Sequence, residues 1–314
     1  MLAVANFHYI RHDFNADYPS IYGLSPKQFK DQLKELAKYG RFVSQAEVLE
    51  GIPENDKAIL ITFDDGLKEQ FDLAKPILDE LKIPFICFVN TSNFTERKVS
   101  LVHKIHLLRS KVPPSSLLNE IEKKSSICLD TEEVSKATAH YNYDSEEVAT
   151  LKYLLNFKLG LKELKQFTDR LFENHFNESV VVDKLYMTSQ QLQELWSNDN
   201  LGSHGHHHDP LGMLNLDEAQ ENLKNTQQFF EDEFGARARS FSYPYGSYEA
   251  SKGLEKILQN AGFEVAFTME RALNRDTSGN RYLLGRYDCN DLPGGKANLF
   301  KTTTLFQDPD FSKW

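Results

Sequence analysis

The chain has 314 residues, a length that fits either two domains or one α/β barrel with an insertion. Its 40% hydrophobic and 12% aromatic residues are enough for a sizeable core, and its 26% charged residues are typical of a globular protein, so extended disorder is excluded. The net charge of −10 argues against nucleic acid as a partner, because binding to a phosphate backbone requires clustered lysine and arginine.

Cysteine spacing and hydropathy indicate the compartment. Cys87, Cys128 and Cys289 are far apart, which predicts free thiols rather than a disulfide framework or a cysteine zinc site. The apolar run over residues 1–9 is too short for the core of a signal peptide and has neither a basic leader nor a cleavage site. No window reaches the roughly 18 consecutive apolar residues of a spanning helix. We therefore expect a cytoplasmic protein without a transmembrane segment.

The first part of the chain alternates between short apolar runs and helical patterns, which is the rhythm of βαβ units. Ser25 and Pro26 have the pattern of an N-cap followed by a first-turn proline. Phe29, Leu33 and Leu36 are spaced for one buried face of that helix. In chain order we expect a strand over 2–9, a helix over 26–39, a strand over 58–63, a helix over 71–81 and a strand over 85–90.

A charged, helix-favouring segment over residues 93–183 interrupts this alternation. We interpret it as a helical insertion within a single barrel that extends over residues 1–314. Helices are expected within it around 105–108, over 151–161 and over 164–176. After it we expect strands over 201–203, 240–243 and 265–268 and helices over 217–234 and 254–261. The fold class is therefore α/β, a distorted (β/α) barrel with a helical insertion.

The strongest chemical signal is an apolar strand, residues 59–63, that ends in Asp64-Asp65-Gly66. Parallel sheets and barrels present their chemistry at the carboxyl ends of strands, so these carboxylates are expected in a cleft rather than in the core. The alternative is that Asp64 or Asp65 caps the following helix.

A second strand, residues 201–203, is followed by four histidines within five positions, His204 and His206 to His208. His204 and His208 are four residues apart, so their rings can converge on one cation. Imidazole combined with carboxylate suits zinc, cobalt or similar metals. The alternatives are a solvent-facing histidine tract and an adventitious metal site.

These two blocks resemble the polysaccharide deacetylases, the NodB-homology group also called carbohydrate esterase family four. The first family motif, Thr-Phe-Asp-Asp-Gly, is present without change at residues 62–66, and the second, Ser-His with a histidine four positions later, begins at Ser203. The resemblance implies a fold of the polysaccharide deacetylase type. It also implies that Asp64 is the catalytic base. The implied ligands of a divalent metal, zinc first with cobalt, nickel or manganese as alternatives, are Asp65, His204 and His208.

The second motif departs from the family in one respect. Proline normally follows the second histidine directly, whereas Asp209 separates His208 from Pro210 here. His207 is therefore an alternative ligand, although the spacing from His204 favours His208.

The third family motif, a strand that ends in Pro-Tyr-Gly, appears at residues 241–246. By resemblance this block forms a wall of the substrate groove, to which Tyr243 and Tyr245 belong, and the backbone at Tyr245 helps to hold the oxyanion. The arginine common in this block is replaced by Ser242. In a subset of the family an arginine from the following block contacts the base instead, which implies that role for Arg286. A surface ion pair is the alternative for Arg286.

The last family motif, which supplies a histidine as general acid, is missing because no histidine follows His208. His8 and His12, near the first strand, are the candidates to protonate the leaving amine. The segment over residues 7–10 resembles the opening of the family's surface-polysaccharide branch. A structural role is the alternative for His8.

The resemblance covers roughly residues 1–92 and 184–291. It implies a metal-dependent hydrolase that removes an N-acyl group, N-acetyl in the first instance, from an amino sugar during surface polysaccharide or lipopolysaccharide synthesis. Tyr243, Tyr245 and Trp196 are candidates to stack on the sugar. The same site could act on a formyl group or an O-acetyl ester, and the missing histidine also fits a carbohydrate-binding relative with little turnover. A zinc deaminase is set aside because the chain lacks the Pro-Cys-x-x-Cys signature.

Overall fold

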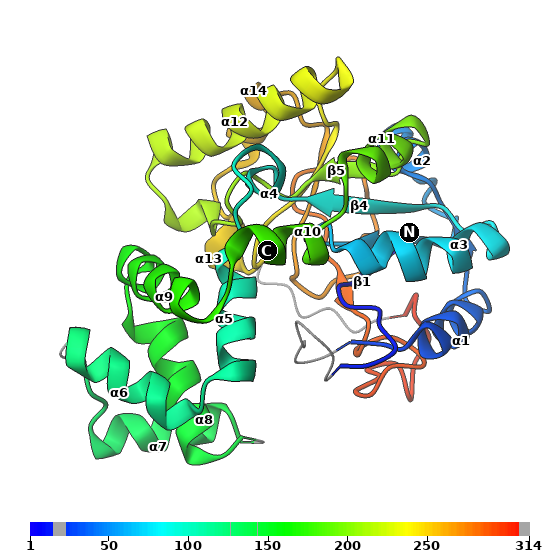
Figure 1. The fold of residues 1–314 in the computed structure, drawn as a ribbon. Helices are drawn as coiled ribbons and strands as arrows, with labels where there is room; N and C mark the ends of the chain where they lie inside the picture. The colour runs from blue at the N-terminus through cyan, green and yellow to red at the C-terminus, as the bar shows by residue number, and fades with distance from the viewer. Residues whose placement is uncertain (15–22, 126, 143, 308–314) are drawn as a thin grey trace. The chain divides into compact units, whose positions relative to one another are not determined.

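The computed structural model describes residues 1–14, 23–125, 127–142 and 144–307, and the chain forms two compact units (Figure 1). Of the described residues, 1–14, 23–98 and 182–307 form the first unit, and 99–125, 127–142 and 144–181 form the second. Among the described residues, no helix is both long and apolar enough to cross a lipid bilayer. The three cysteines are free thiols, as the sequence predicts.

A curled parallel sheet organises the first unit, and the described residues contribute eight strands to it. The strands are β1 (Leu2–Phe7), β2 (Arg41–Phe42), β3 (Ala58–Phe63), β4 (Phe85–Val89), β5 (Leu201–Ser203), β6 (Ser240–Ser242), β7 (Val265–Phe267) and β8 (Tyr287–Asp288). Their order is β7-β6-β5-β4-β3-β1-β8, and β2 pairs with the beginning of β3 while β4 pairs with its end. A parallel bridge between Phe267 and Leu284 brings the β7 edge to the segment before β8. The expected distorted (β/α) barrel is confirmed.

Both faces of this sheet are buried, and residues along each strand alternate between them with the two-residue period of β structure. On β1, Ala3 and Ala5 belong to the hydrophobic cluster that includes the helices, whereas Val4 belongs to a second cluster. The second cluster contains Phe88 of β4 and Phe267 of β7, whose ring centroids are 5.6 Å apart although these strands are not neighbours. Contact across non-neighbouring strands means that the second cluster fills the inside of the curled sheet.

The inward-facing row of side chains changes from apolar to polar toward the carboxyl ends of the strands. On β1, Leu2 and Val4 are followed by Asn6, and on β3, Leu60 is followed by Thr62, all of them buried. The parallel register pairs Asn6 with Thr62. The barrel interior is therefore apolar at one end and carries hydrogen-bonding groups at the other, where parallel barrels place their chemistry.

Helices alternate with these strands in the first unit. The first helix begins at Ser25, which forms a capping box with Gln28, as the sequence predicts for this N-cap. The helices of this unit are α1 (Pro26–Leu36), α2 (Gln45–Glu50), η1 (Gln70–Ala74), α3 (Lys75–Leu81), α4 (Ser92–Thr95), α11 (Ser189–Ser197), η3 (Leu211–Met213), α12 (Leu216–Phe234), α13 (Tyr248–Ser251) and α14 (Glu255–Ala261). In Figure 1, α12 and α14 lie side by side, in agreement with their contacts.

Several boundaries in the first unit differ by a few residues from those expected, and two of these differences have a clear local cause. The first strand ends at Phe7 rather than at residue 9, because the chain then turns to pair with residue 24, where the amide of Leu24 donates to the carbonyl of Tyr9. The helix expected over 71–81 begins as the π-helix η1 and continues as α3. Pro76, which has no N–H to donate, lies at that junction.

The second unit is helical in its described residues. It contains α5 (Leu101–Lys111), α6 (Pro114–Ser125), α7 (Thr131–His140), α8 (Glu146–Tyr153), η2 (Leu154–Lys158) and α9 (Leu161–His175), and α10 (Glu178–Leu185) leads back to the first unit. The single helix expected over 151–161 is wrong: the helix ends after η2, because Leu159 and Gly160 are extended, and Gly160 is the N-cap of α9. Helices α6 and α7 were not expected, since their sequences carry few apolar residues.

Packing in the second cluster predicts that truncating Leu60 destabilises the folded chain. Leu60 has no exposed surface and belongs to the same cluster as Val4, Phe88 and Phe267. We expect Leu60→Ala to lower the free energy of unfolding by about 2–5 kcal/mol, because a cavity is left inside the barrel. The measurement is urea unfolding.

The matched control is Leu216→Ala, since Leu216 is 59% exposed at the start of α12. A change within about 0.5 kcal/mol is expected there. Equal effects of the two substitutions would contradict a packed barrel interior.

Candidate active site

The candidate site lies where three neighbouring parallel strands end. Asp64 and Asp65 follow β3 directly, His204 follows β5, and β4 lies between these two strands. The backbone extends the sheet into these residues, because the amide of Asp64 donates to the carbonyl of Phe7 and that of His204 to the carbonyl of Val89. Helical residues begin at 68, directly after Leu67, so neither aspartate occupies the N-cap position of that helix.

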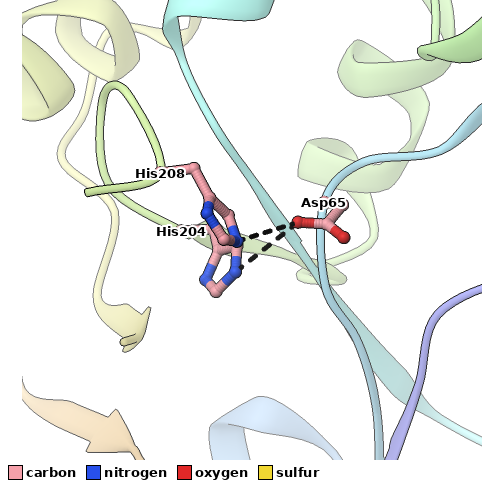
Figure 2. A group of neighbouring side chains, drawn as sticks. All are labelled: Asp65, His204 and His208. Atoms are coloured by element: carbon pink, nitrogen blue, oxygen red, sulfur yellow. Dashed lines mark ion pairs between the residues drawn. The ribbon is translucent and has the colours of Figure 1, made fainter. Parts of the chain in front are cut away.

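Asp65, His204 and His208 point toward one another (Figure 2). The Nε2 atoms of His204 and His208 lie 3.7 Å and 3.5 Å from Oδ1 of Asp65, and the two ring centroids are 5.0 Å apart. All three side chains are buried. One potential ligand atom from each residue lies within 4.8 Å of the others, a spacing that allows all three to reach one ion.

The orientation of His204 is fixed by its other ring nitrogen. Its Nδ1 lies 2.7 Å from the carbonyl oxygen of Ser242, and a carbonyl can only accept, so Nδ1 carries the proton and Nε2 keeps its lone pair. Burial lowers the pKa of His204, although the charges of Asp64 and Asp65 act in the opposite direction. The neutral ring is the form that binds metals.

The donor set fits a divalent metal of the zinc type. Two imidazoles and one carboxylate are the ligands that zinc and its neighbours accept, and three protein ligands leave a coordination position for solvent or substrate. The hydrogen bond from His204 to Ser242 supplies the outer support that metal-binding imidazoles usually have. Asp65, His204 and His208 are thus able to hold such an ion.

His207 does not belong to this group. Its Nε2 lies 3.7 Å from Oε1 of Glu96. His208, with a positive φ of 59°, provides the second imidazole beside Asp65. Of the two registers that the sequence left open, the geometry favours His208.

Asp64 forms a buried, two-pronged ion pair with Arg286. The NH1 and NH2 atoms of Arg286 donate to the two carboxylate oxygens of Asp64 at 2.9 Å and 2.7 Å. Arg286 has no exposed surface and Asp64 is 2% exposed. This arrangement excludes the surface ion pair that was the alternative for Arg286, and a paired guanidinium is the form in which a buried charge is tolerated.

The polar ends of the strands satisfy the rest of the guanidinium. Arg286 also donates to the carbonyl of Thr268, to Oδ1 of Asn6 and to Oγ of Ser242, at 2.8 to 2.9 Å. Asn6 in turn donates from Nδ2 to Asp64 at 3.1 Å. Ser242, the position where the arginine of the family motif is missing, therefore contacts Arg286. The sequence reasoning missed Asn6, whose signal is a single amide within an otherwise apolar strand.

The charges around Asp64 decide its protonation. Burial opposes the ionised form, but the Arg286 guanidinium, together with His204 and His8, outweighs burial and holds the pKa of Asp64 well below its usual range. Asp64 is therefore a carboxylate at every pH at which the protein would be assayed. A group of this kind accepts hydrogen bonds and protons but does not donate them.

Three residues of the site have a left-handed backbone. Asp65, His208 and Tyr245 have φ values of 80°, 59° and 62°, which lie in a region of backbone conformation that residues other than glycine rarely adopt. Such conformations cost on the order of 1–3 kcal/mol each and persist only when the surrounding structure enforces them. They orient Asp65 and His208 toward each other and bring the Tyr245 ring to 4.9 Å from that of His208.

Two aromatic residues expected to contact a sugar lie elsewhere. Tyr243 has no exposed surface and packs against Phe241 in the core on the helix side of the sheet, so its assignment to the groove is wrong. Trp196 stacks on Phe234 of α12, with ring centroids 4.9 Å apart. Tyr245, by contrast, is 46% exposed beside His208 and remains available to a ligand.

The two candidate proton donors differ in position. His8 is partly buried and close enough to Asp64 to influence its ionisation, whereas His12 is exposed. The carbonyl of His8 accepts a hydrogen bond from Gln70, which also donates to the carbonyl of Asp64. Tyr9, which the sequence reasoning did not include, is buried near Asp65. Burial and that negative charge raise the pKa of its phenol well above the usual value.

A buried cluster of imidazoles and a carboxylate at the carboxyl ends of the strands lies where parallel α/β barrels have their active sites. The family model "Polysaccharide deacetylase" matches residues 51–127 and 168–266, more than half of the chain. The chain belongs to the polysaccharide deacetylase family, whose members are hydrolases that act on the amide bonds of carbohydrates. No curated protein matches the sequence significantly.

Solved structures resemble this fold over most of its length. IcaB from Ammonifex degensii is 20% identical with a TM-score of 0.54, covering 91% of this chain and 90% of its own. The Streptococcus pyogenes deacetylase PplD, solved in complex with acetate, is 13% identical with a TM-score of 0.54 and 91% coverage of both chains. The deacetylase domain of BpsB from Bordetella bronchiseptica is 16% identical with a TM-score of 0.51, covering 91% of this chain and 96% of its own.

The ion pair predicts a pH-dependent penalty for Arg286→Met in metal-free protein. Because the variant leaves a buried carboxylate without its cation, we expect the free energy of unfolding at neutral pH to fall by about 3–5 kcal/mol. Without Arg286, burial raises the pKa of Asp64 above that of the unfolded chain, so the penalty is present at higher pH and shrinks as Asp64 becomes protonated on acidification. Denaturant unfolding at several pH values measures this.

Two comparisons make that result specific. Adding Asp64→Asn to the Arg286→Met variant removes the unpaired charge and should restore part of the stability at neutral pH. Arg239→Met breaks an exposed pair with Glu264 and should cost about 1 kcal/mol or less. A penalty for Arg286→Met that does not change with pH would contradict the role assigned to the pair.

Proposed function

We propose that this protein is a metal-dependent carbohydrate deacetylase that hydrolyses the N-acetyl group of an amino sugar. The observation that carries the proposal is the convergence of Asp65, His204 and His208 beside the ionised Asp64. Membership of the polysaccharide deacetylase family supports the class of substrate. The acetate bound by PplD of Streptococcus pyogenes is the product that such a reaction releases.

The metal is proposed to be divalent, with zinc as the first choice. A divalent cation bound by such residues acidifies water and polarises the carbonyl oxygen of the substrate. Asp65, His204 and His208 are its proposed ligands, and all three side chains are buried.

Asp64 is proposed as the general base. Asp64 is ionised, and unlike Asp65 it is not a proposed metal ligand. Its carboxylate is oriented by Arg286 and Asn6. The low pKa makes it a weak base, so its proton transfer depends on water that has already been acidified. Arg286 is a positioning residue, because all its described contacts are to the protein and none of its surface is exposed.

Tyr245 is proposed to contact the reacting group. Its left-handed backbone follows β6 and Pro244, and its ring is half-exposed next to His208. A backbone N–H at this position would stabilise the negative oxygen of the tetrahedral intermediate, an interaction worth about 3–4 kcal/mol in comparable enzymes. The exposed face of the ring is suited to stacking on a sugar.

His8 is proposed to donate the proton that the leaving amine requires. It lies at the end of β1, partly buried and electrostatically coupled to Asp64. Its position on the first strand differs from that of the histidine in the last family motif. The proposal therefore assigns to His8 the step for which the expected family residue is missing.

The proposed activity is tested by acetate release from oligosaccharides of N-acetylglucosamine in the presence of zinc or cobalt. Asp64→Asn is expected to lower the rate by a factor of about 10²–10⁴, because the neutral amide cannot accept a proton. The metal content should persist in this variant, since Asp64 is not a proposed ligand.

A chelator should abolish the wild-type rate, and added metal should restore it. Unchanged turnover in Asp64→Asn would remove that residue from the base role. Sugar binding without any acetate release by the metal-loaded wild-type protein would instead favour a binding protein that has lost turnover. Release of formate or of an ester-linked acetyl group would redefine the substrate but not the site.

The role of His8 is tested separately by the pH profile of kcat. We expect His8→Gln to lower kcat by a factor of about 10²–10⁴ and to remove the fall in rate at alkaline pH that a protonated donor produces. His12→Gln is the matched control, because His12 is exposed, and its profile should be that of the wild type. An unaltered kcat in His8→Gln would show that another group supplies the proton.

A further inference from the structure

We propose that Glu96, His206 and His207 form a second metal site, separate from the group of Asp65, His204 and His208. The proposal concerns metal binding and does not depend on the proposed hydrolytic function. It uses the two histidines of the tract that the first group leaves out.

The three side chains already converge on a small volume. Nε2 of His206 lies 2.9 Å from Oε1 of Glu96, and Nε2 of His207 lies 3.7 Å from the same oxygen. The two imidazole centroids are 4.2 Å apart. One ligand atom from each residue lies within 4.8 Å of the others, the same spacing found in the first group.

His206 is held in place before any ion binds. Its ring is buried, and Nδ1 makes a 2.7 Å hydrogen bond with Oγ1 of Thr91. Its backbone is tied to α4 and α12, because its carbonyl accepts from the amide of Ser92 and its amide donates to Oδ1 of Asn222. Nε2 donates to Oε1 of Glu96, because a carboxylate can only accept, so a bound ion would replace the proton on Nε2. The Thr91 hydroxyl, which can also accept, would then support Nδ1 as the outer partner that metal-binding imidazoles usually have.

The surroundings of the site suit a cation that exchanges with solvent. The side chains of Glu96 and His207 are 43% and 42% exposed, so an ion can enter and water can complete its coordination. Asp209 is close enough for its negative charge to act on His206. Two imidazoles and one carboxylate favour zinc, cobalt, nickel or copper over magnesium or calcium, which prefer oxygen ligands.

The histidines of both groups come from one short loop, but they face different carboxylates. Gly205, with a φ of 78°, separates His204 from His206, and His208 returns to Asp65 with a φ of 59°. A metal on Glu96, His206 and His207 would therefore join the end of α4 to the loop that carries His204 and His208. An ion bound in this second site would hold that loop in place.

The test uses a chain without a histidine tag in which Asp65→Asn and His208→Ala disable the first group. After saturation with zinc and removal of free metal, elemental analysis should find one zinc per chain. Adding His207→Ala should remove it, and Glu96→Gln, which keeps the shape of the side chain but not its charge, should weaken zinc binding at least about tenfold. Adding His175→Ala, an exposed histidine on α9, should change nothing.

A second readout uses the otherwise unaltered protein. His207→Ala alone should retain acetate release, if the wild type has it, but should lose part of the zinc-dependent rise in Tm, because an ion that binds only the folded chain stabilises it. The proposal is overturned if the chain with the disabled first group retains no zinc, or if its zinc persists after His207→Ala. In either case Glu96 and His206 form only a hydrogen-bonded pair.

Discussion

The buried pair of Arg286 and Asp64 is the constraint around which the polar end of the barrel is arranged. Two full charges inside a protein are tolerated only when every donor of the guanidinium and both carboxylate oxygens have partners. That requirement explains why the inward-facing residues nearest the ends of β1 and β6 are polar, Asn6 and Ser242, where the rest of the inside is apolar. It also explains why Asp64 remains ionised despite burial. The proposed role of this carboxylate as a base and the stability of the barrel interior thus depend on the same contacts.

The parallel sheet connects that pair to the candidate metal ligands. Because β3, β4 and β5 are neighbours and all point the same way, the residues after β3 and after β5 meet at one edge. Asp64 faces the inside and its pair with Arg286, while Asp65, with its left-handed backbone, faces the histidines. One turn of chain therefore supplies two carboxylates with different environments, one kept ionised by a guanidinium and one available to an ion.

Much of the candidate site could be predicted from the residues at strand ends, and the predictions that failed did so for physical reasons. Asp64, Asp65 and His204 were predictable because apolar runs that stop at polar residues mark the carboxyl ends of parallel strands. The error at Tyr243 was avoidable. The two-residue period of a strand puts Phe241 and Tyr243 on the same, helix-covered side of the sheet and leaves Ser242 on the inside. Spacing from His204 favoured His208 over His207, but it left His207 as an alternative, because the direction of each ring depends on the positive φ values of the loop. Arg286 came only from resemblance, because no local pattern places it beside a residue 222 positions away.

The left-handed conformations at Asp65, His208 and Tyr245 have a consequence for selection. Glycine would adopt each of these backbone angles without steric cost, so replacing any of the three relieves strain while it deletes a functional side chain. A library screened only for heat resistance would therefore tend to enrich substitutions at three residues to which the proposed reaction assigns a role. At these three positions, selection for higher stability would favour glycine, whereas selection for the proposed activity would retain the present side chains.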